Sequence, residues 1–223
     1  MVENIQPLLP IAPPEYSTDP SSDFYLEAIE VYETVNNLAP DEKVIAEFWS
    51  DDPGNTATPP GHSNSIMLQI LKSENANLAT TAELYAKLGM ALHDAFISCW
   101  YAKYVYNLIR PISYIHEHLE DNWTIPLATP PFPEYTSGHS VQSGATAQVL
   151  TDFFGDDYAF TDNMHVNRTD IDGTPRSFSS FYDFADEAAI SRLYGGIHYR
   201  AAIDIGVDQG KGIGQNIATL DFK

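Results

Sequence analysis

The feature that most constrains the fold is a long helical pattern over residues 80–108. Apolar and aromatic residues occupy most faces of this segment, and Pro111 stops the pattern shortly after it. A helix that is apolar on most faces must be surrounded by other elements. We therefore expect this helix to lie at the centre of the fold.

Shorter helical patterns occupy most of the remaining chain. They cover residues 21–37, 40–49, 62–71, 111–119, 139–154, 181–196 and 203–220. Residues 156–177 are polar and aperiodic, and loops of that length are usually functional covers or disordered. Because no segment shows the alternation of a strand, the sequence predicts an all-α helical bundle.

The sequence also indicates how the domain begins. Residues 1–20 contain five prolines and no pattern, so we expect an extended N-terminal arm that either wraps the domain or is disordered. Residues 21–223 are expected to form a single helical-bundle catalytic domain. A chain of 223 residues with 43% apolar composition has ample material for one core.

Net charge and apolar runs limit the partners. A net charge of −20 makes nucleic acids and anionic membranes poor partners, because like charges repel. No apolar run approaches the roughly 18 residues of a spanning helix, and no signal segment is visible. A chain cut from a longer precursor would look the same, so the missing segment says little about the compartment. A periplasmic or secreted location is the expectation. The sequence leaves open whether the protein forms a homo-oligomer.

The few basic residues are informative because of where they fall. Only eleven Lys and Arg are present, yet Lys103, Arg110 and Arg192 lie in helical segments rich in apolar residues. A buried cation needs a carboxylate or a bound anion as its partner. Lys103 and Arg110 are seven residues apart, close to two helical turns, so both emerge from one face.

Two further segments offer groups that would suit an anion. A Pro-rich loop leads into a helix expected to start at Ser137 or Gly138, and a helix start presents unpaired N–H groups. Ser137 adds a hydroxyl, Gly138 permits close approach, and His139 adds a titratable ring. Arg192 and His198 lie together at a later helix end. This collection of cations and N–H groups favours a tetrahedral oxyanion over a common divalent metal.

The order and spacing of the three segments resemble a known signature. They are similar to the motifs shared by vanadium-dependent haloperoxidases and the type 2 phosphatidic-acid phosphatase superfamily. Trp100 before Lys103, and the run at residues 132–135, resemble the chloroperoxidase branch. One departure is Thr136, where these families usually carry proline. The resemblance implies a helical bundle of the haloperoxidase and acid phosphatase type that binds vanadate, with phosphate or sulfate able to occupy the same site.

The resemblance also implies roles for individual residues. His198 would ligate the vanadium of vanadate, or attack phosphorus, and His139 would act as acid and base. In a peroxidase, Lys103 would also polarise the peroxide. The residues expected to bind the oxyanion oxygens are Lys103, Arg110, Ser137, Gly138 and Arg192.

Other residues receive supporting expectations. Trp100 and Phe132 are expected to form a pocket wall. The orienting carboxylate is less well defined: Asp204 could serve His198, and Asp52 could pair with Arg192. His62 is expected to have a structural role at a helix start. For His165, in the polar segment, we expect exposure to solvent.

Three functions remain open at this stage. The leading one is a vanadate-dependent haloperoxidase that acts on hydrogen peroxide and a halide. The second is a soluble acid phosphatase that hydrolyses a phosphomonoester through a phosphohistidine, and the third is a non-catalytic phosphate- or vanadate-binding domain. The expected absence of membrane spans disfavours a lipid phosphatase.

Overall fold

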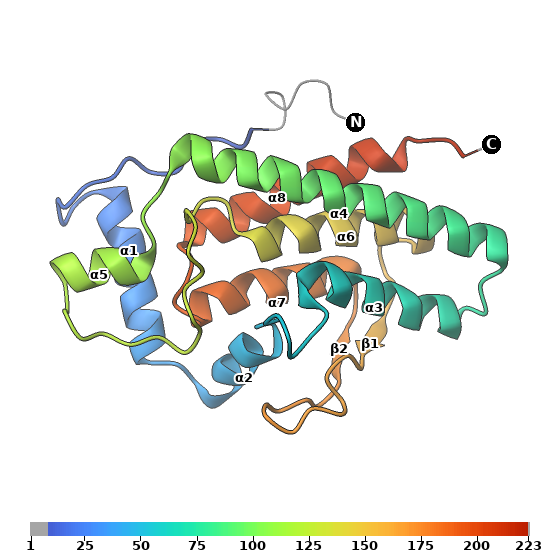
Figure 1. Cartoon of the computed structure of the whole chain (residues 1–223), viewed down its shortest axis with the longest axis horizontal. Helices are drawn as coiled ribbons and strands as arrows, with labels where there is room; N and C mark the ends of the chain where they lie inside the picture. The colour runs from blue at the N-terminus through green and yellow to red at the C-terminus, as the bar shows by residue number, and fades with distance from the viewer. Residues whose placement is uncertain (1–8, 223) are drawn as a thin grey trace.

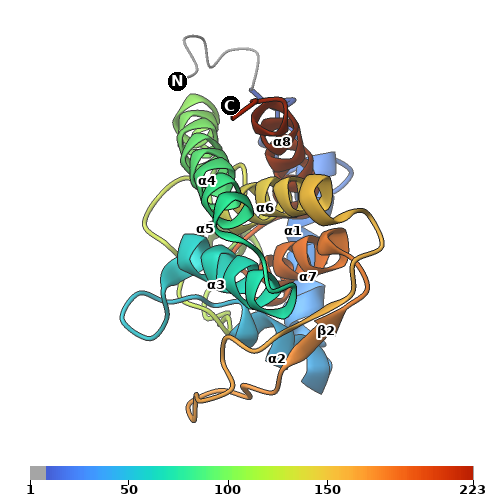
Figure 2. The ribbon, with the colours of Figure 1, turned by 90° about the vertical axis from the view of Figure 1, so that its right-hand side faces the viewer.

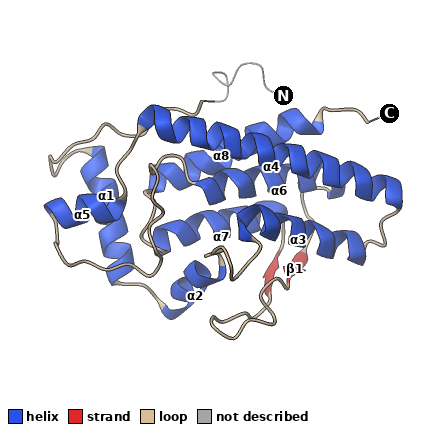
Figure 3. Cartoon of the chain, viewed as in Figure 1, coloured by secondary structure: helices blue, strands red, loops and turns tan. Residues whose placement is uncertain are grey.

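The structure, a computed structural model, describes residues 9–222 and consists of eight helices and one small sheet. The elements are α1 (Asp23–Asn36), α2 (Pro40–Phe48), α3 (Thr58–Ser73), α4 (Leu78–Tyr106), α5 (Pro111–His118), α6 (Gly138–Phe154), β1 (Phe160–Asp162), β2 (Arg176–Phe178), α7 (Phe181–Tyr194) and α8 (Arg200–Ala218) (Figures 1 and 3). The predicted all-α class is confirmed. Over the described residues, no helix combines the length and apolar character needed to cross a membrane.

The helices begin where local chemistry favours a start. The hydroxyl oxygens of Ser22, Ser137 and Ser180 each accept a hydrogen bond from a backbone N–H in the first turn of α1, α6 and α7. Pro40 and Pro111 occupy the first positions of α2 and α5, where the missing N–H costs nothing. These signals explain why the predicted helix starts are close to the observed ones.

The central helix is α6. Every residue from Ser140 to Thr151 is buried, because α4, α7, α8 and α3 surround the helix (Figure 2). The expectation of a central α4 is wrong: its Phe96, Tyr101 and Tyr104 side chains are exposed. α6 is the central helix because its small residues allow neighbouring helices to pack closely against it on several sides.

The backbones of α6 and α8 touch where they cross. A Cβ atom built on Gly144 would lie 2.3 Å from the Val207 carbonyl oxygen. One built on Gly210 would lie 2.0 Å from the Val141 carbonyl oxygen. Real atoms cannot approach so closely, so glycine is required at both positions. The crossing sets the start of α6 against α8, and the Ser137 N–H donates to the Ala202 carbonyl at 3.0 Å.

The polar segment at residues 156–177 contains a sheet that the sequence did not predict. β1 pairs antiparallel with β2, with Phe160 opposite Phe178. Both rings pack on the core next to Phe184. Three-residue strands are too short for alternation to be visible in the sequence.

Part of the predicted N-terminal arm can be followed. Residues 1–8 lie outside the described part of the chain, whereas residues 9–19 are without helix or strand. Tyrosine hydroxyls of the domain donate to carbonyls of this arm: Tyr106 to Pro10 at 2.8 Å, and Tyr114 to Ser17 at 2.7 Å. Of the two alternatives, this part of the arm therefore wraps the domain.

The helix crossing leads to a prediction about two neighbouring glycines of α8. Gly210→Ala should destabilise the protein by about 1–3 kcal/mol or more, because the added methyl group meets the α6 backbone. Gly212→Ala, where nothing lies within 4 Å, should stabilise it by about 0.5–1 kcal/mol. Urea unfolding of both variants measures the difference. Equal effects would contradict the close crossing.

Candidate functional site

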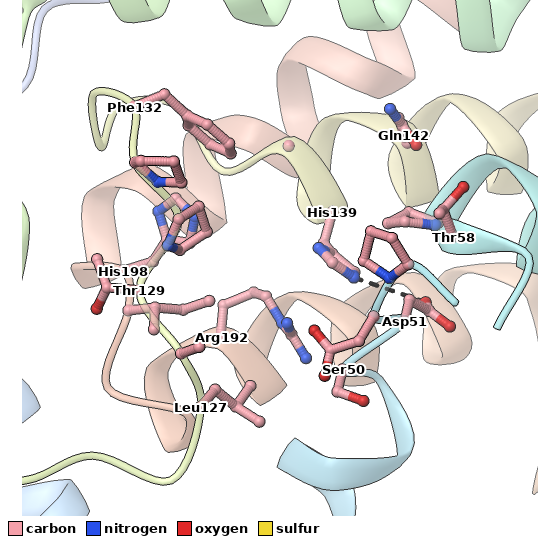
Figure 4. Close-up of a pocket in the computed structure, with 18 of the residues that line it drawn as sticks. Ser50, Asp51, Thr58, Leu127, Thr129, Phe132, His139, Gln142, Arg192 and His198 are labelled. Carbon is pink, nitrogen blue, oxygen red and sulfur yellow. Dashed lines mark ion pairs between the residues drawn. The ribbon is translucent and has the colours of Figure 1, made fainter. Parts of the chain in front are cut away.

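A cavity of about 540 Å³ opens at the N-terminus of α6. Its wall combines apolar residues such as Phe96 and Pro131 with a few polar groups that point inward (Figure 4). The residues predicted from the sequence that line it are Asp52, Trp100, Phe132, Gly138, His139, Arg192 and His198. These residues come from α4, α6, α7 and the loops between helices, so the fold brings together distant parts of the chain.

Lys103 lies behind the aromatic wall. Its side chain is fully buried, and its ammonium donates to the carbonyl oxygens of Pro133, Glu134 and Thr136 at 3.1, 2.8 and 2.5 Å. Burial lowers the pKa of Lys103 to about 8. In this arrangement the three N–H donors hold the loop before α6. Lys103 thus contributes its charge through the wall, 5.3 Å from the centre of the Phe132 ring.

Arg110 and Ser137 are also set back from the cavity surface. Arg110 donates from Nε to the Phe132 carbonyl at 2.9 Å and from Nη1 to the Ile197 carbonyl at 2.8 Å. Its buried Nη2 meets no hydrogen-bond partner among residues 9–222. Burial lowers the pKa of Arg110 only to about 10, so the side chain stays charged. The Ser137 hydroxyl oxygen accepts from the Ser140 N–H and caps α6.

The two partners of His198 define its protonation. Arg110 can only donate, so Nε2 of His198, 3.2 Å from Nη1, must be the unprotonated nitrogen. Nδ1 then carries the proton and donates to Glu134 Oε1 at 2.7 Å. Burial and then the charge of Arg110 keep the pKa of His198 well below its usual range. His198 is therefore an uncharged ring whose Nε2 lone pair faces Arg110, and a ligand at Nε2 would replace that hydrogen bond.

Glu134, and not Asp204, is the carboxylate that orients His198. Glu134 is completely buried and also accepts the Tyr199 N–H at 2.9 Å, at the start of α8. Burial raises the pKa of Glu134 to about 8, and the charges of Lys103 and Arg110 oppose that rise. Asp204 is exposed on α8 and lines a different surface hollow. One signal was present in the sequence: an acidic residue within an apolar, Pro-rich loop.

Arg192 is buried next to acidic residues of the loop after α2. Its Nη2 donates to the carbonyls of Ala46 and Trp49. Burial lowers the pKa of Arg192 to about 10, and the charges of Asp51 and then Asp52 oppose this. Among the described residues no ion pair joins Arg192 to Asp52 or to Asp51, and Asp51 has the larger electrostatic effect on Arg192.

His139 lies opposite His198, and its Nε2 points to Asp51 (Figure 4). The distance from Nε2 to Asp51 Oδ2 is 3.6 Å, which is too long for a hydrogen bond. Burial and then the charge of Arg192 lower the pKa of His139 to about 4, although Asp51 opposes the shift. At neutral pH the ring is uncharged and can accept a proton.

Behind Asp51 lies a buried chain of charged groups that the sequence analysis missed. His62 Nδ1 lies 2.9 Å from Asp51 Oδ1, and its Nε2 lies 2.6 Å from Asp162 Oδ2. His165 lies beside them and is only 1% exposed, so the expectation that solvent surrounds it is wrong. The turn after β1 carries His165 inward, which the polar sequence around it does not indicate.

The arrangement suits a tetrahedral oxyanion such as vanadate or phosphate. Arg192, the charge of Arg110 and the start of α6 supply a positive potential and N–H donors. The unused N–H group of Arg110 and the lone pair of His198 Nε2 are the groups that such an anion would engage. The residues present therefore fit the cofactor that the sequence analysis proposed.

Comparison with known families gives a match over more than half the chain. The family described as the VCPO second helical-bundle domain matches residues 83–124 and 119–221. This region includes most of α4, all of α5 to α8 and all residues of the three motifs.

Individual relatives agree with the family match. Vanadium chloroperoxidase of Curvularia inaequalis is 26% identical over 69% of this chain and 35% of its own length. The crystal structure of a bacterial vanadium-dependent iodoperoxidase superposes with a TM-score of 0.90 at 45% identity, over 97% of this chain and 54% of that one. A holo-type bacterial vanadium-dependent chloroperoxidase, at 22% identity and a TM-score of 0.71, shares the fold over 87% of this chain and 46% of its own. The chain spans about half or less of the length of each of these relatives.

The contact between Glu134 and His198 predicts a result for paired variants. In the wild type and in Glu134→Gln, an oxygen acceptor faces Nδ1, so His198 should stay in the Nδ1–H tautomer. Glu134→Ala removes the acceptor and leaves Arg110 as the remaining constraint on the ring, so a measurable population of the Nε2–H tautomer should appear. ¹⁵N NMR of the imidazole nitrogens distinguishes these states. An unchanged tautomer in Glu134→Ala would show that Arg110 alone determines it.

Proposed function

Because the chain belongs to the family of the VCPO second helical-bundle domain, we propose that it is a vanadate-dependent haloperoxidase that oxidises a halide with hydrogen peroxide. The observation that carries the proposal is the state of His198, whose unprotonated Nε2 lies beside Arg110 at the start of α6. The relatives at 45% and 26% identity are haloperoxidases by name, which favours this activity over phosphatase activity at a similar site.

The residues that would hold vanadate are defined by their donors. His198 Nε2 would ligate the vanadium, while Arg110, Arg192 and the N–H groups at Gly138 would bind its oxygens. When bound, vanadate supplies activation of hydrogen peroxide without changing its own oxidation state. Glu134 holds the His198 ring in the required tautomer, as carboxylates commonly do for metal-bound histidines.

His139 would manage the protons of the reaction. Oxidation of a halide by hydrogen peroxide to a hypohalous acid consumes one proton and releases one water. An uncharged His139 can take a proton from peroxide as it binds and return it to the departing oxygen. Because its Nε2 points to Asp51, Nδ1 is the atom left to face the cavity.

The aromatic wall would favour a weakly hydrated halide. Trp100 and Phe132 face the cavity with ring centres 5.1 Å apart, and both lie within 6 Å of the Lys103 ammonium. We propose that Lys103 acts on peroxide and halide by its charge, because its N–H donors are used by the loop carbonyls. Iodide is the most weakly hydrated common halide and the most easily oxidised, so it is the first to test.

The first functional prediction concerns His198. Wild-type protein loaded with vanadate should oxidise iodide and bromide with hydrogen peroxide. His198→Ala should lose about 100-fold or more in rate, since mutation of an outer-shell partner alone typically costs about 10–100-fold and loss of the ligand itself should cost at least as much. His93→Ala, an exposed position on α4, serves as the control.

A different pair of assay results would identify the protein as a phosphatase. In that case vanadate-loaded protein would not oxidise halide from acidic to neutral pH. The vanadate-free protein would hydrolyse a chromogenic phosphomonoester, and vanadate would inhibit it.

The second functional prediction concerns Trp100. Trp100→Ala opens the wall beside Gly138 and lets water reach the halide, so KM for iodide should rise about tenfold while kcat changes less. Trp100→Phe, which keeps an aromatic ring, should stay within about threefold of wild type. Steady-state kinetics with iodide measure both. An effect confined to kcat would place Trp100 outside the halide site.

A further inference from the structure

The buried residues behind the cavity pose a charge problem. Asp51 lines the cavity and Asp162 lies directly behind it, and both are essentially inaccessible to solvent. Two buried carboxylates next to a pocket for an anion would repel that anion. Buried charges of this kind persist only when cations neutralise them. The charge of Arg192 acts on Asp51 without a direct ion pair, so a cation in direct contact with the two carboxylates is expected.

His62 has the contacts of that cation. Its Nδ1 lies 2.9 and 3.1 Å from the two oxygens of Asp51, and its Nε2 lies 2.6 Å from Asp162. An ionised carboxylate only accepts hydrogen bonds, so each ring nitrogen must carry a proton and the ring must be an imidazolium. The indole of Trp49 stacks on the ring at 4.6 Å, which further favours a positive charge.

The carboxylates on both sides are fixed in place. Asp162 Oδ1 accepts the Met164 N–H at 2.9 Å and the Gln69 amide at 3.2 Å. Both oxygens of Asp51 face His62, and its Oδ2 also lies 3.6 Å from His139 Nε2. The ring of His62 thus connects a rigid carboxylate in β1 to the carboxylate that faces the cavity.

We propose that His62, as an imidazolium held between Asp162 and Asp51, is the positioning residue that neutralises these carboxylates and keeps Asp51 directed at His139, so that the cavity can hold an anion. The inference rests on the proposed function for the identity of that anion. The charge balance itself concerns any oxyanion, including sulfate. His62 does not touch the anion and acts through Asp51.

A metal site is the competing interpretation of the same residues. Asp51, His62 and His165 place possible ligand atoms within 4.8 Å of one another, and Nε2 of His165 has no hydrogen-bond partner among the described residues. A metal would need the lone pair of His62 Nδ1, which points at both Asp51 oxygens and carries a proton in the arrangement observed. The geometry therefore favours the imidazolium.

The pKa of His62 sets the pH range in which the charge persists. Burial alone would lower the pKa of His62, but the charge of Asp51 and the hydrogen bond to Asp162 raise the pKa of His62 to about 9. A raised pKa means that the imidazolium is fully present at neutral pH and is lost as pH rises through about 9. The other charged or titratable groups near it are His139 of α6, Arg192 of α7, and His165 and Arg168 of the turn after β1.

The test uses sulfate as the anion, because its charge does not change between pH 6 and 10. Isothermal titration of vanadate-free protein at pH 7 should show that His62→Gln binds sulfate about tenfold more weakly than wild type, since a buried unit charge has been removed. The double variant His62→Gln/Asp162→Asn removes a positive and a negative charge together. It should recover most of the lost affinity, which a merely structural role for His62 would not allow.

The pH dependence and the ring itself provide independent measurements. The affinity gap between wild type and His62→Gln should close as pH rises through about 9. ¹⁵N NMR of wild-type protein should show both His62 ring nitrogens protonated at pH 7. His93→Gln, an exposed position, should bind sulfate like wild type.

Several results would overturn the inference. One is a neutral His62 ring at pH 7. Others are a wild type that does not bind sulfate, a His62→Gln variant that binds sulfate as tightly as wild type, or a double variant that binds it no better than His62→Gln. Stoichiometric zinc binding that is lost in His165→Ala would also overturn it. None of these measurements uses halide oxidation. A wild type that binds sulfate as expected but oxidises no halide would therefore refute the proposed function alone.

Discussion

The direct contact between the backbones of α6 and α8 is the constraint on which the site depends. Gly144 and Gly210 leave no side chain between the two helices, so the start of α6 lies against the first turn of α8. His139 belongs to α6, and His198 lies just before α8. Any larger residue at the crossing would separate the helices and move the two imidazoles apart.

A second constraint is electrostatic. The pocket for an anion needs permanent cations, yet cations can be buried only with compensation. The structure meets this need in two ways: Lys103 and Arg110 are satisfied largely by backbone carbonyls, and Arg192 by carbonyls and the charge of Asp51. Carbonyls stabilise a cation without adding a full negative charge, so the site keeps a positive potential for its ligand. The carboxylates that do approach, Glu134 and Asp51, each lie against a histidine.

The protonation states of the three histidines follow from their partners. His198 is neutral because it is buried and faces Arg110, and His139 is neutral because it is buried near Arg192. His62 is charged because it lies between two carboxylates. In the proposed function the same side chain would thus serve as a ligand, a proton acceptor and a fixed cation within one region. Only the surroundings differ.

The sequence by itself determined the helices and the three motifs. Proline and serine residues mark the helix starts, such as Pro111 and Ser137, because their effect on the backbone is local. The spacing within the motifs and their resemblance to a known signature selected Arg110, Arg192 and His198, and the structure places Arg192 and His198 in one cavity wall with Arg110 beside His198.

Tertiary structure alone decided which helix is central and which carboxylate serves which histidine. Glu134 reaches His198 across 64 residues of sequence, and His62 reaches Asp162 across 100. Asp204 is near His198 in sequence but lies on the exposed side of α8. Long-range contacts of this kind depend on how helices cross and where a turn folds inward. Local preferences carry no information about these arrangements: the acidic residue in the Pro-rich loop marked Glu134 as unusual without naming its partner, and nothing in the sequence indicated the charged chain behind Asp51.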